Sequence, residues 1–95
     1  MTTILVRCRV ADYESWRQSY EQFFASPLGS HVRSVHIWRG QDDPNVVVLA
    51  ETYDSREMAE ADATNPAMEE VMVRDGVDLA SVSMDYLDSV GSLAR

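Results

Sequence analysis

The sequence predicts a single α+β domain in which four strands and two helices follow one another in the ferredoxin-like order βαββαβ. Three observations lead to this fold class. The chain has 95 residues, which leaves room for one hydrophobic core. Four segments alternate apolar and polar residues, as strands do, and two others repeat apolar residues at helical spacing. A tight turn at 40–45 joins the two middle strands, so these are expected to pair as a hairpin of an antiparallel sheet.

The first strand and the first helix are expected on either side of Asp12. Residues 3–10 place an apolar side chain at every second position, which is typical of a strand. Asp12 stands where a helix N-cap belongs, and Pro27 with Gly29 ends the helix. Between them an aromatic stripe recurs at helical spacing, and it consists of Tyr13, Trp16, Tyr20, Phe23 and Phe24.

The segments 31–39 and 45–53 are expected to form the second and third strands. In 31–39, His36 and Trp38 share one face by alternation. The segment 45–53 contains the unbroken apolar run 46–50. A strand that is apolar on both sides must be covered on both faces of its sheet.

The second helix is expected to begin at Asp54, because Asp54 and Glu57 resemble a capping box. Asn65-Pro66 interrupts this helix, since Asn can cap a helix and Pro suits the first position of a new turn.

The chain after the second helix is expected to form the last strand. Gly76 can supply the left-handed residue that ends the helix. Residues 79–87 alternate again and predict a strand, and 88–95 read as a polar tail. We therefore expect one domain over 1–95.

Self-association is expected because this topology leaves one sheet face without cover. Right-handed crossovers put both helices on the same face. The opposite face then carries one side of the run 46–50, together with Leu5 and with Val35 or Ile37. A twofold-related copy packed face to face is the economical cover, so we expect a homodimer.

The charge balance and the cysteine content indicate which kinds of partner and which cellular compartment to expect. The formal net charge is −8, divided into +2 over residues 1–40 and −10 over 41–95. Such an acidic surface repels phosphate backbones, so no nucleic-acid partner is expected. No apolar run approaches the ~20 residues of a membrane span, and neither a secretory leader nor a membrane partner is expected. The single cysteine, Cys8, fits a reducing compartment, so we expect a cytoplasmic protein.

The chain resembles the dimeric α/β-barrel superfamily, which includes the antibiotic biosynthesis monooxygenases and the stress-responsive barrel proteins. The resemblance covers nearly the whole chain. It implies a dimer and a small-molecule pocket. Similar sequences often carry a histidine where this chain has Cys8, and polar residues or histidines near the end of the first helix, at Phe23, Phe24 and Ala25. Its motifs are the strand before Asp12-Tyr13-x-x-Trp16, the hairpin at Arg39-Gly40 and Asp42-Asp43-Pro44-Asn45, the helix broken at Asn65-Pro66, and Gly76-Val77 before the last strand.

His36 and Trp38 are the candidate catalytic residues. A histidine beside an aromatic residue could steer or deprotonate an enolisable phenol, because the histidine pKa lies near physiological pH. A packed or surface histidine is the alternative interpretation.

The ligand-binding candidates are aromatic and apolar side chains that the first helix and the sheet would enclose. An aromatic-lined concavity with few polar groups suits a flat apolar ligand, although the same spacing also predicts core packing. Cys8 fits a small buried hydrophobe better than a nucleophile. No Cys and His spacing suggests a metal site. The candidates are Cys8, Trp16, Tyr20, Phe23, Phe24 and Tyr53.

Two functions remain open on the sequence, which does not decide whether the chain is an enzyme. The resemblance implies a cofactor-independent monooxygenase that acts on an aromatic or polyketide-type small molecule. There the substrate itself, as a phenolate or an enolate, reduces oxygen, so neither metal nor flavin is needed. The alternative is a non-catalytic dimeric module that binds a small ligand or another protein. A titratable group in a deep pocket would favour the enzyme, and a pocket filled by Trp16, Phe23 and Phe24 would favour the module.

Overall fold

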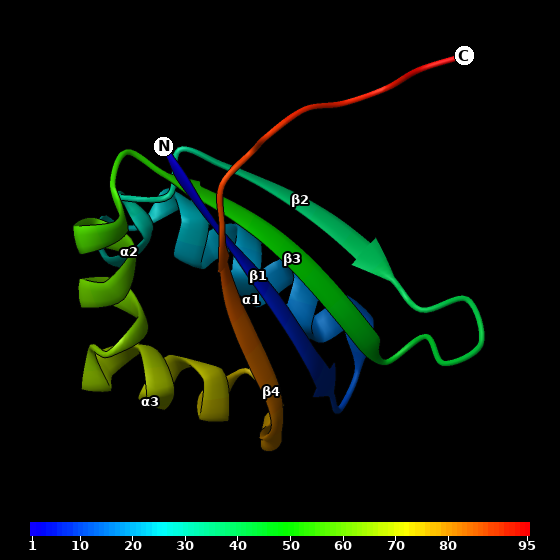
Figure 1. Ribbon diagram of the computed structural model, residues 1–95. Coiled ribbons are helices and arrows are strands. Elements are labelled where there is room, and N and C mark those ends of the chain that lie inside the picture. Colours follow the sequence, from blue (N-terminus) through cyan, green and yellow to red (C-terminus); the bar gives the residue numbers. More distant parts are fainter.

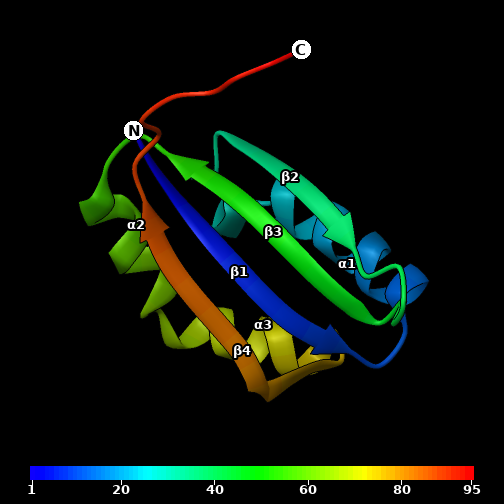
Figure 2. The same ribbon diagram turned by 45° about the vertical axis from the view of Figure 1, so that its right-hand side comes forward.

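The computed structural model describes all 95 residues and has a four-stranded antiparallel sheet with its helices on one face (Figure 1). The strands lie in the order β2-β3-β1-β4, which is the ferredoxin-like arrangement (Figure 2). The predicted α+β fold class is therefore confirmed. The elements are β1 (Thr2–Val10), α1 (Tyr13–Ala25), a 3-10 turn (Pro27–Gly29), β2 (Ser34–Arg39), β3 (Val46–Tyr53), α2 (Arg56–Ala63), α3 (Pro66–Arg74) and β4 (Val77–Leu87).

Local capping signals account for most helix boundaries. The Asp12 side chain accepts a hydrogen bond of 3.0 Å from the backbone N–H of Ser15 at the start of α1, as predicted. Asn65 caps α3 in the same way through the N–H of Ala67, which divides the second helical segment into α2 and α3. The expected cap at Asp54 is wrong, since Ser55 accepts from the N–H of Met58 at 3.2 Å.

The second strand is shorter than expected, because residues 30 and 31 still belong to a turn and the N–H of Val32 bonds back to the carbonyl of Gly29. Val32 comes after this turn and is buried in the core, and β2 begins only at Ser34. The last strand is longer than expected and starts at Val77, directly after Gly76. Gly76 has a φ of +83°, so the predicted left-handed residue is present.

The core lies between the helices and the sheet. The side chains of β1 and β3 alternate between the two faces, and those toward the helices are buried. Twelve buried apolar or aromatic residues form one cluster: Ile4, Val6, Cys8, Val10, Trp16, Tyr20, Val32, Val47, Leu49, Tyr53, Ala59 and Val77.

The opposite side of the sheet, called the open face below, is covered by no element of the chain. Register places one row of side chains across it, since His36 pairs with Ala50, Ala50 with Leu5, and Leu5 with Asp85. The next row contains Trp38, Val48, Arg7 and Ser83. Leu5 therefore lies on the open face as predicted.

Val35 and Ile37 differ from the expectation, because they pack on the core side of the sheet. Val35 pairs with Glu51 and Ile37 with Leu49, and both partners are buried toward the helices. Alternation could not assign the two faces of this strand, since each carries apolar side chains.

The tail after β4 runs away from the domain (Figure 1). Val90 and Leu93 in this tail are almost fully exposed. No helix is long and apolar enough to cross a membrane.

Candidate functional site

An apolar cavity of about 100 Å³ lies between the helices and the sheet. Fourteen of its 16 lining residues are hydrophobic, and the two others are Glu51 and Asp75. The short helix α3 closes part of the cavity with Met68, Val71 and Met72. The remaining lining residues are Ile4, Val6, Cys8, Trp16, Tyr20, Phe23, Leu49, Tyr53, Ala63, Val77 and Met84.

Three aromatic side chains of α1 form one wall of the cavity. Trp16, Tyr20 and Phe23 recur at helical spacing and therefore point to the same side of α1. The ring centroids of Trp16 and Tyr20 are 5.4 Å apart, and those of Tyr20 and Phe23 are 5.5 Å apart. These distances lie within the range that favours tilted aromatic pairs, so the wall is a continuous packed surface.

A buried carboxyl group, that of Glu51, stands in the cavity wall. Glu51 follows Leu49 and precedes Tyr53 on the inward face of β3, and 9% of its surface is exposed. The hydroxyl of Tyr20 donates a hydrogen bond to its Oε2, whereas Oε1 has no hydrogen-bond partner within the chain. Burial is the main cause that raises the pKa of Glu51, and the hydrogen bond from Tyr20 partly opposes this. Apart from Asp75, the pair is thus the polar part of an apolar enclosure.

Asp62 is a second buried carboxyl group, and its charge acts on Glu51. Asp62 lies on α2 and is 7% exposed, and its Oδ1 is 3.1 Å from Nδ1 of His31. Its Oδ2 has no hydrogen-bond partner. The negative charge of Asp62 contributes to raising the pKa of Glu51. His31 is half-exposed and pairs with this carboxyl group.

Cys8 faces the cavity from β1 but is poorly suited to act as a nucleophile. Burial, together with the charge of Glu51, raises the pKa of the Cys8 thiol to about 11. Because of this raised pKa, the thiol stays protonated near neutral pH, whereas the thiolate is the reactive form.

The structure brings together five of the six ligand-binding candidates. Cys8, Trp16, Tyr20, Phe23 and Tyr53 line the cavity. Phe24 does not, because it follows Phe23 by one residue on α1 and is 40% exposed.

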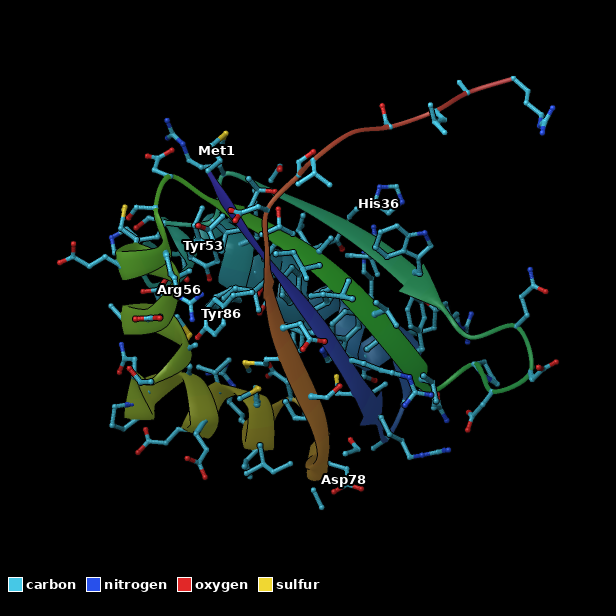
Figure 3. The ribbon with its side chains drawn as sticks, viewed as in Figure 1. Met1, His36, Tyr53, Arg56, Asp78 and Tyr86 are labelled. Carbon is cyan, nitrogen blue, oxygen red and sulfur yellow. The ribbon has the colours of Figure 1, made fainter.

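The two catalytic candidates lie elsewhere. His36 and Trp38 are on the open face of β2, where their rings stack with centroids 4.2 Å apart. Figure 3 shows His36 on the far side of the sheet from Arg56, the first residue of α2, and well apart from Tyr53 and Tyr86. Neither residue contacts the cavity between helices and sheet.

Glu51 is the site residue that sequence reasoning missed. A signal for it exists, since Val47, Leu49, Glu51 and Tyr53 occupy alternate positions of one strand and must share a face. The hydrogen bond from Tyr20 and the nearby charge of Asp62 leave no local signal, because α1 and α2 supply them from other parts of the chain. No group of three or more His, Cys, Asp or Glu side chains is arranged to hold a metal ion.

Comparison with known proteins identifies the fold. A scan against models of protein families gives no match, and a search of curated proteins gives none either. Solved structures do match, including SnoaB, a cofactor-independent oxygenase from Streptomyces nogalater, with a TM-score of 0.71 and 14% identity over 99% of this chain and 97% of that one. A putative antibiotic biosynthesis monooxygenase from Nitrosomonas europaea matches with a TM-score of 0.63 and 21% identity over 96% of this chain and 100% of that one.

The protein At3g17210 from Arabidopsis thaliana has a TM-score of 0.70 and 12% identity over 99% of this chain and 100% of that one. The chain therefore has the ferredoxin-like fold of monooxygenase-like structures over nearly its whole length. Identities this low establish the fold alone.

Proposed function

We propose that the protein is a monooxygenase-like enzyme whose active site is the cavity between the helices and the sheet, with Glu51 as the general base. The observation that carries this proposal is the Glu51 carboxyl group, buried in an apolar wall with one oxygen free. A carboxyl group with a raised pKa removes a proton from a weakly acidic phenol more effectively than an ordinary one. The fold shared with SnoaB supports the same reaction class.

The chemistry needs molecular oxygen as its co-reactant. Glu51 accepts the proton of a phenolic hydroxyl, and the electron-rich phenolate passes electrons to oxygen. A carbon–oxygen bond then forms at the ring carbon opposite the hydroxyl, which gives a hydroperoxide. Loss of water from this hydroperoxide breaks the oxygen–oxygen bond and leaves a quinone. One phenol and one oxygen molecule thus yield one quinone and one water.

Oxygen uptake with a panel of phenols that have an unsubstituted para position tests this assignment. We expect Glu51→Gln to reduce turnover by about 10²-fold or more, since general bases contribute on that scale. Glu57→Gln is the matched control, because Glu57 is exposed on α2 and loses the same charge. His36→Ala tests the assignment made from sequence. If Glu51→Gln kept full turnover while His36→Ala lost it, the reaction would belong to the open face.

A non-catalytic ligand-binding module is the second candidate. The cavity that Trp16 and Phe23 help to line measures only about 100 Å³, which is below the roughly 300–1,000 Å³ of ordinary ligand pockets, and this small volume favours a module that holds a small ligand. Tight binding of a phenol without oxygen uptake would identify the module.

The protein is also proposed to be a homodimer joined through its open face, in a reducing compartment such as the cytoplasm. This face exposes Trp38 and presents the apolar side chains of Leu5 and Val48. Arg7 and Asp85 lie on it as well, and neither forms an ion pair within the chain. An apolar centre with unpaired charges of both signs suits a self-complementary interface.

A further inference from the structure

We propose that the cavity selects neutral hydroxyaromatic molecules of a single ring and rejects carboxylated or multi-ring ones. This substrate class rests on the proposed function, because it assumes that the same cavity is the active site. Three independent properties of the cavity lead to it: its volume, the sign of its charges and its free acceptor.

The volume limits the ligand to one ring. The cavity measures about 100 Å³. For comparison, a dry cavity of about 150 Å³ in another protein holds one benzene molecule. The cavity here is smaller, so one ring already fills it, and a second fused ring would require side chains of the wall to move. The three methionines of the wall, Met68, Met72 and Met84, are the most adaptable of these, since methionine is unbranched and flexible.

The charges of the wall exclude an anionic ligand. Glu51 and Asp75 are its only charged residues, and both are acidic, whereas no Arg or His lines the cavity. The partner of Asp75 is Arg74, whose Nε is 3.2 Å from Oδ1 and whose side chain is 69% exposed. A ligand carboxylate would thus be buried beside like charge with no cation to pair with, and burying an unpaired charge is costly.

The free acceptor calls for a hydroxyl group on the ligand. Oε1 of Glu51 has no hydrogen-bond partner within the chain, while Oε2 receives the Tyr20 hydroxyl. This oxygen is not one of the fully buried polar atoms that lack a partner, so it is accessible, and a ligand hydroxyl can donate a hydrogen bond to it. The aromatic wall of Trp16 and Phe23 then faces the ring.

Binding measurements with three probes test the selectivity without requiring turnover. The probes are phenol, 4-hydroxybenzoate, which is anionic near neutral pH, and 2-naphthol, and calorimetric titration gives each dissociation constant. We expect wild-type protein to bind phenol at least about tenfold more tightly than either other probe. Glu51→Gln should narrow the gap between phenol and 4-hydroxybenzoate, and Met72→Ala should narrow the gap between phenol and 2-naphthol. Glu57→Gln should change neither gap.

Equal affinity of wild-type protein for phenol and 4-hydroxybenzoate would overturn the proposal, and so would a failure to bind phenol. Both results come from wild-type protein, so they test the proposal even if a substitution prevents folding. Oxygen uptake with a carboxylated or multi-ring phenol would overturn this selectivity and leave the proposed function standing. Selective binding of phenol without oxygen uptake would support the selectivity and overturn the proposed enzymatic function.

Discussion

At the scale of single residues, the ionisation of Glu51 links folding stability to pH. Burial raises the pKa of Glu51 in the folded protein above its ordinary value of 4.5. The folded state therefore binds the Glu51 proton more tightly than the unfolded state, and this contribution is fully present below pH 4.5. It is lost as the pH rises toward the folded-state pKa, at about 1.4 kcal/mol for each unit of pKa difference.

We predict that Glu51→Gln is more stable than wild type at pH 8 and that the difference disappears near pH 4.5. Glutamine keeps an acceptor for the Tyr20 hydroxyl but carries no charge, so only the ionisation is removed. Urea unfolding between pH 4.5 and pH 8 measures the difference. Glu57→Gln, on the exposed side of α2, should show no such pH-dependent gain. A constant difference at every pH would mean that Glu51 does not ionise with a raised pKa.

The buried polar residues show where prediction from sequence ends. Alternation along β3 is sufficient to place Glu51 on the inward face, because its neighbours Leu49 and Tyr53 are apolar or aromatic. That Glu51 meets Tyr20 and Asp62 depends on how α1 and α2 pack, and no local pattern contains this information. The pairing of His31 with Asp62, 31 residues apart, has the same character.

At the scale of elements, Gly76 controls the passage from α3 to β4. Its φ of +83° is a conformation that other residues adopt only with strain. A Cβ added at Gly76 would also lie 3.3 Å from the Cβ of Ala11. We predict that Gly76→Ala lowers the free energy of unfolding by about 1–2 kcal/mol, which thermal or urea unfolding measures. Ser92→Ala is the control, because Ser92 is exposed in the tail after β4, and it should leave stability unchanged. Equal stability of the two variants would contradict the role given to Gly76.

Helix boundaries were predictable where one side chain decides them. Asp12 and Asn65 act as caps because each follows an extended segment and precedes a helical one. The start of α2 was displaced by one residue, since Asp54 instead forms an ion pair with Arg33 at 3.1 Å and Ser55 takes the cap. Asp and Ser are both preferred cap residues, so the local sequence does not choose between these two adjacent positions.

At the scale of the whole molecule, the order of elements and the apolar run of β3 were enough to predict the fold class and its uncovered face. Val47 and Leu49 turn toward the helices, while Val48 and Ala50 turn to the open face. The sequence could not place His36 and Trp38 relative to the cavity, because both faces of β2 carry apolar side chains. A face to which a copy docks and a face that encloses a ligand have similar apolar patterns along a strand.

The final prediction concerns this open face. Ala50 lies near its centre, between His36 of β2 and Leu5 of β1. We predict that Ala50→Glu converts a dimer into a monomer, because two twofold-related copies would bury like charges against apolar side chains at their contact. Light scattering coupled to gel filtration at about 10 µM measures the mass, and circular dichroism verifies that the variant is folded. Ala61→Glu is the matched control, since Ala61 is exposed on α2 and receives the same charge, and it should remain dimeric. A monomeric wild-type protein, or a folded Ala50→Glu dimer, would show that the open face is not where two copies meet.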